Sequence, residues 1–260
     1  MDFKLKGKKA LVTGGSHGIG LSISKLLIEE GCSVAICSRT QTRINEALGE
    51  LKSPNVESFG MLCDVAKKED IERVVSDIND KWGGVDILIN NAGGGGRWGS
   101  EDVLKTGEEV WEEVYAKNTT AAIRFSKAFI PKMQEKKWGR VVTITSILGI
   151  QGGGRPWFNI AKTAQTALMK NFALNKDFIR KGITFNSVAP GGIFINNTGW
   201  EEEMKNNPVA FKKKMDKEFR LGRLGTTDEV ASVVTFLCSE AASLVNGASI
   251  LVDGGETAVF

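Results

Sequence analysis

The sequence predicts an α/β domain built around a mainly parallel β-sheet. Short apolar runs of four to eight residues, rich in Val and Ile, alternate with segments of helical periodicity along the chain. Runs of this kind are typical of strands buried on both faces of a parallel sheet, and their alternation with helices is typical of α/β domains. Glycine is in excess, at 30 of 260 residues, about 12% against an average of roughly 7%. Because no collagen period accompanies them, these glycines are expected where the backbone turns tightly or approaches a ligand.

Seven runs are predicted to be strands. In chain order they are Ala10–Thr13, Ser33–Cys37, Val56–Cys63, Val85–Ile89, Arg140–Thr145, Ile183–Val188 and Ser249–Val252. Two helices are marked by apolar residues that share one helical face. These residues are Ile19, Ile23, Leu26 and Leu27 in the first helix and Val230, Val233, Val234 and Leu237 in the last. Thr226 and Glu229 have the spacing of a capping box, which predicts that the last helix begins there.

Composition and charge exclude several classes of protein. With 42% hydrophobic and 25% charged residues, the chain is close to the globular average and long enough for one large domain. The net charge of +3 does not suggest a nucleic-acid surface, and no apolar stretch approaches the roughly 20 residues of a membrane helix. We therefore expect no nucleic-acid partner and no membrane association.

The cysteines and the single histidine limit the cellular compartment and the catalytic chemistry that can be expected. The four cysteines form no CxxC pair, and the N-terminal segment reaches a glycine loop before any signal-peptide apolar region of adequate length. A reduced, cytoplasmic setting is therefore expected. The single histidine, His17, nearly excludes a His-based metal cluster or a Ser-His-Asp triad, and no metal site is predicted.

A glycine-rich loop follows the first predicted strand and opens the first predicted helix. Its sequence, TGGSHGIG over residues 13–20, has glycines in a GxxxGxG pattern. Glycines at this place permit a tight turn and a close approach of the backbone to a pyrophosphate at a helix N-terminus. The candidate cofactor-binding residues of this loop are Gly14, Ser16, His17, Gly18, Ile19 and Gly20.

The residues just after the second predicted strand favour NADP(H) over NAD(H). An acidic residue there would bind the free 2′-hydroxyl of NAD and repel a 2′-phosphate, but the chain has Ser38 and Arg39 instead. The arginine fork suits phosphate oxygens, the serine offers a hydroxyl, and His17 could add a donor.

Several further motifs, in the right order, give the chain a clear resemblance to the short-chain dehydrogenase/reductase family. The resemblance is to its form of about 250 residues, including 3-oxoacyl-ACP reductase-like members, and covers nearly the whole chain. The motifs are Cys63-Asp64-Val65, Asn90-Asn91-Ala92-Gly93, Asn118, Ser146, Lys162, Pro190-Gly191-Gly192, Gly222-Arg223-Leu224-Gly225 and Val252-Asp253-Gly254-Gly255. The resemblance implies a single Rossmann-type doubly wound domain over residues 1–260, with a seven-stranded mainly parallel sheet and helices on both faces.

The resemblance also implies roles for the matching residues. Asp64 would hydrogen-bond the adenine ring, and Val65 would pack beside it. Ser146 would hydrogen-bond the substrate carbonyl or hydroxyl, Lys162 would hold the nicotinamide ribose and lower the pKa of a neighbouring phenol, and Asn118 would hold a water of a proton relay. The other implied cofactor contacts are Asn91, Ala92 and Gly93 beyond the fourth strand and Pro190, Gly191 and Ile193 along the nicotinamide. The implied reaction is NADP(H)-dependent interconversion of a carbonyl and a secondary alcohol in a small molecule.

One catalytic position departs from the family pattern. The proton-donor tyrosine of the YxxxK motif stands four residues before the lysine, and here that position is Phe158. Phenylalanine has no proton to give, and a general acid contributes about 10²–10⁴ in rate, so strongly impaired catalysis is expected. The only tyrosine, Tyr115, is interpreted as a packing residue, and His17 lies in the adenosine half of the expected site.

Three interpretations of Phe158 remain open. The chain is a variant in which a tyrosine was replaced, leaving a disabled enzyme. Alternatively it is a natural pseudo-enzyme, an NADP-binding module with a binding or regulatory role. In the third interpretation it reduces a nucleotide sugar or other anionic ketone with substrate- or water-assisted protonation.

Three further features concern the substrate and the assembly of the chain. Residues 191–223 form a long excursion with apolar anchors among many lysines, which predicts a substrate lid. Arg97 and Arg155 are candidate anchors for a substrate carboxylate or phosphate. By family resemblance, the helices expected over 108–133 and 161–178 would pack against their copies in a homotetramer or a homodimer.

Overall fold

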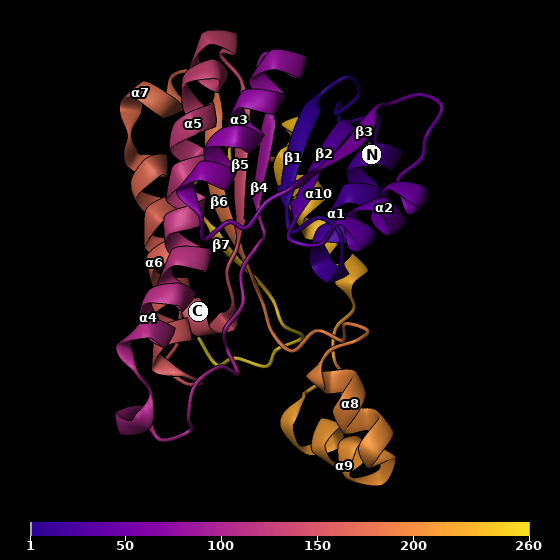
Figure 1. Cartoon of the computed structure of the whole chain (residues 1–260), viewed down its shortest axis with the longest axis vertical. Coiled ribbons are helices and arrows are strands. Elements are labelled where there is room, and N and C mark those ends of the chain that lie inside the picture. The colour runs from indigo at the N-terminus through magenta and orange to yellow at the C-terminus, as the bar shows by residue number, and fades with distance from the viewer. Residues whose placement is uncertain (1, 260) are drawn as a thin grey trace.

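All seven predicted strands form and lie side by side in one sheet of the computed structural model, which describes residues 2–259 (Figure 1). Their order is β3-β2-β1-β4-β5-β6-β7, and every neighbouring pair is parallel. The strands are β1 (Lys9–Thr13), β2 (Ser33–Ser38), β3 (Ser58–Leu62), β4 (Ile87–Asn90), β5 (Gly139–Ile144), β6 (Ile183–Pro190) and β7 (Ser249–Val252). This is the Rossmann-type doubly wound fold that the sequence predicts, with a sheet that is entirely parallel.

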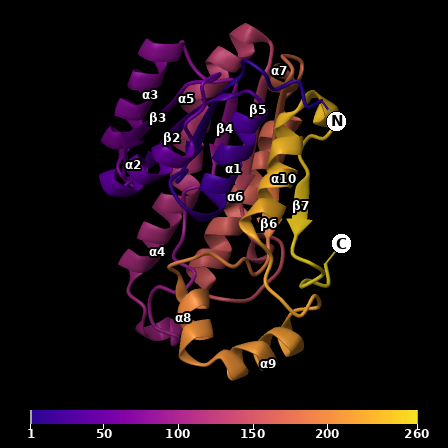
Figure 2. The ribbon, with the colours of Figure 1, turned by 90° about the vertical axis from the view of Figure 1, so that its right-hand side faces the viewer.

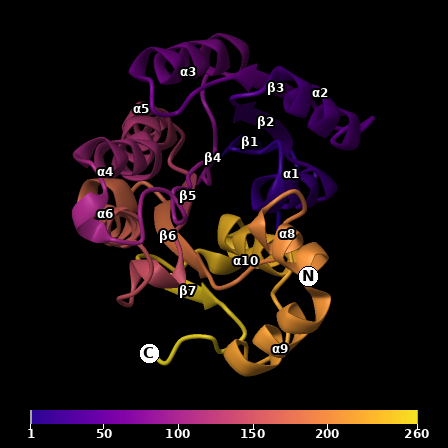
Figure 3. The same cartoon turned by 60° about the horizontal axis from the view of Figure 1, so that its bottom comes forward.

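Helices cover both faces of the sheet, as Figure 3 shows. One face packs against α1 (Gly18–Glu29), α2 (Gln41–Glu50) and α10 (Thr227–Cys238), and the other against α3 (Lys68–Trp82), α5 (Ala121–Lys136) and α6 (Pro156–Leu174). The remaining helices are α4 (Glu108–Tyr115), α7 (Lys176–Ile179), α8 (Gly199–Asn206) and α9 (Pro208–Glu218). Along β1, Ala10 and Val12 belong to one core and Leu11 to the other, because successive strand residues point to opposite faces.

Local sequence explains where several helices begin and end. The capping box predicted for α10 forms, since the Thr226 hydroxyl accepts from the Glu229 amide and the Glu229 carboxylate accepts from the Thr226 amide. Helix α6 begins at Pro156, whose missing amide proton is not needed in the first turn. Helix α3 ends before Gly83, which has a φ of 69° and is therefore suited to a left-handed cap.

The strand order places a crevice at the carboxyl ends of β1 and β4. From β1 the chain adds β2 and β3 on one side and then returns to add β4 on the other, so the loops after β1 and β4 diverge at this point. Ligands of open α/β sheets bind at such a reversal of strand order. The glycine-rich loop leaves β1 here, and Asn91 follows β4.

Helices α8 and α9 occupy the segment that the sequence predicts as a lid, and Figures 1 and 2 show them beyond one end of the sheet. They have a small apolar core of their own, with half-buried aromatic rings packed around it. Its members are Met215, Phe219 and Leu224, surrounded by Phe194, Trp200 and Phe211. Across residues 2–259, no helix is both long enough and apolar enough to cross a bilayer.

Candidate active site

The glycine-rich loop makes a turn that side chains would obstruct. Gly18, the first residue of α1, has a φ of 56°, and a Cβ there would lie 3.1 Å from Ile195 Cγ2. A Cβ on Gly20 would overlap the carbonyl oxygen of Gly14. The start of α1 therefore packs directly on the end of β1.

A hollow at the carboxyl ends of β1, β2 and β4, called here the nucleotide hollow, gathers most of the predicted cofactor residues. Its lining is Gly14, Ser16, His17, Cys37, Ser38, Arg39, Arg43, Cys63, Val65, Asn91, Ala92, Gly93 and Lys117. Asp64 is not part of this lining; its carboxylate accepts from the Ala66 amide in the turn before α3.

The nucleotide hollow is basic. Among its described lining residues are His17, Arg39, Arg43 and Lys117, but no aspartate or glutamate. Sequence reasoning missed two of these. Arg43 lies in the first turn of α2, shortly after Arg39 in the preceding bend, and lines the same hollow. Lys117 is almost fully buried next to the predicted Asn118, 3.1 Å from a Glu113 oxygen and 3.9 Å from the centre of the Trp98 ring.

Hydrogen bonds tie the loops after β1 and β4 together. The Thr13 hydroxyl accepts from the amides of Asn91 and Ala92, each at 3.0 Å, and donates to the Ile89 carbonyl at 3.2 Å. The Asn91 side chain donates to the carbonyls of Thr13 and Gly14. Asn91 therefore fixes the end of β1 and the glycine loop, which explains why an amide is useful at this position.

A second hollow, called here the reaction hollow, lies between the ends of β5 and β6 and helix α8. Its lining is Ile19, Arg97, Ile144, Thr145, Ser146, Phe158, Pro190, Gly191, Ile193, Ile195, Thr198, Gly199 and Trp200. The fold therefore brings Ser146 and Phe158 to the same hollow as the predicted nicotinamide contacts after β6. The Ser146 hydroxyl accepts from the Leu148 amide at 3.2 Å, and among residues 2–259 it has no hydrogen-bond acceptor for its own proton.

Lys162 stands one turn after Phe158 in α6 and is nearly fully buried. Its Nζ donates to the Ile144 carbonyl at 2.9 Å and lies 5.5 Å from the centre of the Phe158 ring. Within the described residues the ammonium has no acidic partner, and burial lowers the pKa of Lys162 to about 7. A buried, unpaired cation next to a crevice is an arrangement typical of a functional site.

Asn118 lies in a single π-helical turn, Ala116–Thr120, between α4 and α5. Its side chain donates to the Gly94 carbonyl at 2.8 Å and accepts from the Gly94 amide at 3.2 Å, while its own carbonyl accepts from the Gln165 side chain. π-helical turns occur frequently at functional sites. These contacts make Asn118 an anchor of the loop after β4; a role in holding a relay water stays a prediction.

A glutamate that the sequence did not indicate holds the turn after β6. The Glu256 carboxylate accepts from the Gly192 amide at 2.7 Å, and burial raises the pKa of that carboxyl. Ile193 then pairs with Gly225, and Ile195 packs on Gly18 of the glycine loop. The turn therefore spans the gap between the two hollows.

The lysines of the lid segment mostly pair within it. Lys205 and Lys212 form ion pairs with Glu201 and Asp216 of their own helices, both at 2.8 Å. Such pairs are typical of a solvated helix face, so the basic character of the segment needs no anionic partner.

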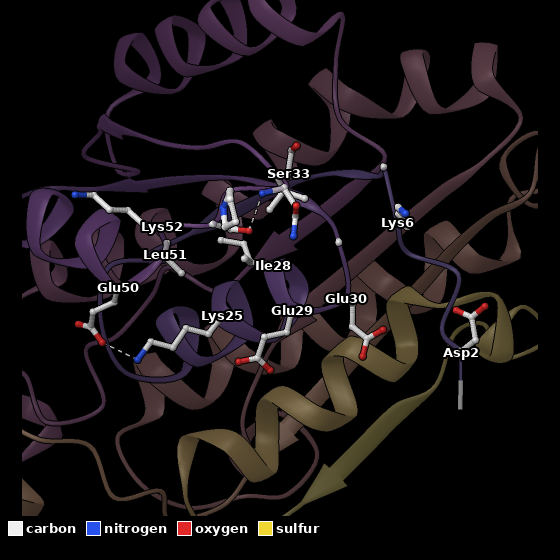
Figure 4. A pocket seen from close by; sticks show the side chains of 16 residues that line it. Asp2, Lys6, Lys25, Ile28, Glu29, Glu30, Ser33, Glu50, Leu51 and Lys52 are labelled. Atoms are coloured by element: carbon white, nitrogen blue, oxygen red, sulfur yellow. Dashed lines mark hydrogen bonds and ion pairs between the residues drawn. The ribbon is translucent and has the colours of Figure 1, made fainter.

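A hollow of about 1200 Å³ lies away from this site. It is formed near the amino ends of β1, β2 and β3, opposite the carboxyl ends that carry the candidate site. Figure 4 shows charges of both signs around it, including the ion pair between Lys25 and Glu50 at 2.6 Å. None of the predicted site residues lines it.

The residues present fit a dinucleotide cofactor. Glycines fill the tight turn at the start of α1, and the nucleotide hollow is basic. The buried Lys162 of α6 donates to the Ile144 carbonyl at the end of β5. Adenosine, phosphates and nicotinamide ribose are the groups that such loops bind in doubly wound folds. The fold and site thus place the chain in the class of Rossmann-type nucleotide-dependent proteins.

Comparison with known proteins identifies the family. A family model described as Enoyl-(Acyl carrier protein) reductase matches residues 14–257. The chain is 35% identical over 254 residues to dehydrogenase/reductase SDR family member 4 of Oryctolagus cuniculus, covering 96% of this chain and 94% of the relative. It is 35% identical over 253 residues to a 3-oxoacyl-(acyl-carrier-protein) reductase of Vibrio cholerae, covering 96% and 98%. The structure matches L-sorbose reductase from Gluconobacter frateurii, solved with NADPH and L-sorbose, with a TM-score of 0.91, 30% identity and 100% coverage of both chains.

The chain belongs to the short-chain dehydrogenase/reductase family, as its motifs predicted. Membership of this family makes it an oxidoreductase of the kind that interconverts carbonyls and alcohols.

Proposed function

We propose that the chain is an NADP(H)-dependent reductase of a carbonyl group, with proton transfer disabled or strongly slowed at Phe158. One observation carries this proposal. The Phe158 ring lies in the reaction hollow with Ser146 and one turn before Lys162, in the place where the family has its proton donor, and it has no hydroxyl.

Four basic side chains support NADP(H) as the preferred cofactor. His17, Arg39, Arg43 and Lys117 surround the nucleotide hollow, and Ser38 adds a hydroxyl. A 2′-phosphate adds negative charge that these residues would bind, whereas the ribose hydroxyl of NAD would find no carboxylate among the described lining residues.

The proposed mechanism assigns tasks to Ser146, which lines the reaction hollow, and to the buried residues Lys162 and Asn118 near it. NADP(H) supplies the hydride when it is bound. Ser146 donates its free proton in a hydrogen bond to the substrate oxygen, which orients the carbonyl and stabilises negative charge that develops on it. Lys162 would hold the nicotinamide ribose, as the family resemblance implies, and Asn118 holds the loop after β4 in place. The proton that must finally reach the oxygen has no donor at Phe158, so this step limits the reaction.

A second candidate function follows from Lys162. Because its pKa is lowered to about 7, the Lys162 ammonium can give up its proton near neutral pH, and a bridging water would pass a proton on to the substrate oxygen, leaving a neutral amine. The chain would then be a slow natural reductase of an anionic ketone. A pseudo-enzyme that binds NADP(H) without reaction is the remaining alternative, and its distinguishing feature is also Phe158.

We further propose that residues 191–223 act as a lid over the reaction hollow, since Gly199 and Trp200 of α8 line it. A homotetrameric or homodimeric assembly and a cytoplasmic setting stay predictions. Sedimentation showing a stable monomer would contradict the predicted assembly.

The decisive experiment compares the chain as it stands with its Phe158→Tyr variant. Both are titrated with NADPH and NADH by calorimetry, and nicotinamide absorbance is then followed with β-keto esters, quinones and keto sugars. We expect both proteins to bind NADPH, and the variant to exceed the parent in kcat/KM by about 10²–10⁴. Equal turnover by both proteins would instead support protonation through Lys162. Binding without reaction in both would support the pseudo-enzyme.

A further inference from the structure

We infer that the substrate carries an anionic group, a carboxylate or a phosphate, which Arg97 binds while the carbonyl lies at Ser146. This inference rests on the proposed function and names the substrate class of the same site. Arg97 is the only ionisable side chain among the described residues that line the reaction hollow. The other lining residues are apolar, small or hydroxyl-bearing, so an anion entering this hollow meets a single cation.

Arg97 can change partners without leaving another charge unpaired. Its guanidinium lies 3.2 Å from a Glu203 carboxylate oxygen and 5.0 Å from the centre of the Trp200 ring. Lys214 approaches the same two residues, 2.8 Å from the other Glu203 oxygen and 4.8 Å from the ring centre. When a substrate anion takes Arg97, Glu203 therefore keeps Lys214 as its counter-ion, and the exchange costs little.

The same contacts connect the proposed anion-binding residue, Arg97, to the lid. Arg97 belongs to the glycine-rich loop after β4, whereas Trp200 and Glu203 belong to α8. A Cβ on Gly199 would overlap the Arg97 guanidinium, so the glycine leaves room for the arginine at the start of α8. A bound anion would lie against both the loop and the lid helix, at an Arg97 side chain that is 58% exposed and therefore open to a ligand arriving from solvent.

Arg155, the other anchor suggested by the sequence, is directed elsewhere. It lies just before α6 and donates to the Ser100 carbonyl at 3.0 Å, with its second amino group 3.4 Å from Glu101. It does not line the reaction hollow. Arg155 therefore provides a matched control, an arginine of the same charge with no access to the substrate.

The test uses two pairs of ketones that differ in charge. Levulinate is compared with methyl levulinate, and dihydroxyacetone phosphate with dihydroxyacetone. Binding to the NADPH-loaded chain as it stands is measured by calorimetry, and kcat/KM is measured in the Phe158→Tyr background. Each is repeated with Arg97→Met, Glu203→Gln and Arg155→Met.

We expect at least one anionic ketone to be preferred over its neutral partner. Arg97→Met should reduce that preference by about 2-fold to 5-fold, because Arg97 is partly exposed and solvent screens its ion pair. Arg155→Met should keep it. Glu203→Gln should keep or increase it, because the variant breaks the link between loop and lid but leaves the cation. If the contact between Arg97 and Glu203 were purely structural, Arg97→Met and Glu203→Gln would each weaken binding of the neutral and the anionic ketones alike.

The outcomes separate this inference from the proposed function. Reduction of neutral and anionic ketones at equal rates, or a preference that survives Arg97→Met, overturns the inference and leaves the function intact. Arg97-dependent binding of an anion, without turnover in the Phe158→Tyr background, supports the anion site and overturns the reductase. Absence of both binding and turnover overturns both.

Discussion

Burial of the Lys162 ammonium should make the stability of the cofactor-free chain rise with pH above neutrality. Desolvation lowers the pKa of this group from 10.5 to about 7 in the folded chain. Between these values the unfolded chain binds a proton at Lys162 that the folded chain has lost. The free energy of unfolding therefore increases with pH across this window, and the full penalty of burying the charge is present below it.

The size of the effect follows from the same pKa values. Each pH unit inside the window contributes about 1.4 kcal/mol, so a fall from 10.5 to about 7 corresponds to about 5 kcal/mol. Between about pH 8 and about pH 10 the gain is about 3 kcal/mol. Lys162→Met removes this term, and it also removes the hydrogen bond to Ile144, which adds a pH-independent loss of about 1 kcal/mol.

Urea unfolding of the cofactor-free parent and of Lys162→Met, at intervals from about pH 7 to about pH 10, measures the effect. Other titrating groups are common to both proteins and cancel in the difference between them. We expect the methionine variant to be the more stable protein near pH 7 and to lose this advantage as the pH rises. A difference that stays constant over the whole range would refute the argument, because it would mean that Lys162 keeps its proton when folded.

Two further predictions concern cofactor choice and helix capping. Arg39→Asp should raise the Kd for NADPH by about 10-fold to 100-fold, because the 2′-phosphate loses a charge-assisted contact and meets a carboxylate. It should keep or lower the Kd for NADH, whose ribose hydroxyl gains an acceptor. Fluorescence titration measures both values, and equal weakening of both cofactors would contradict the prediction. Thr226→Ala should lower the free energy of unfolding by about 1 kcal/mol, because the Glu229 amide at the start of α10 loses its acceptor. Thr226→Ser, which keeps the oxygen, is the control, and equal destabilisation by both variants would argue against the cap.

The strands could be predicted from the sequence because their signal is local. Most of the seven runs are apolar and contain several β-branched residues, and their boundaries shift only slightly. The run Val56–Cys63, with one β-branched residue, becomes Ser58–Leu62. The GxxxGxG loop and the Thr226 cap were recognisable for the same reason, since each is a short motif with a fixed spacing.

The residues that the sequence missed reach the site through tertiary contacts. Glu256 is 64 residues from Gly192, whose amide it binds, and no local sequence pattern indicates that contact. Lys117 is recognisable only once the π-helical turn has directed it into the nucleotide hollow. The two candidate anchors, Arg97 and Arg155, were equivalent in the sequence and are distinguished only by where the loop after β4 and the start of α6 direct them.

The packing around Phe158 leads us to expect that a hydroxyl can be added to its ring with little change in the site. Pro156 fixes the start of α6, and the Phe158 ring packs in an apolar cluster around Trp157. On its other side the loop after β4 approaches closely, since a Cβ on Gly96 would lie 3.4 Å from the ring. The ring is therefore held by contacts that do not involve a hydroxyl, and it already lines the reaction hollow together with Ser146. A gain of activity in Phe158→Tyr would accordingly report the added proton donor and not a rearranged site.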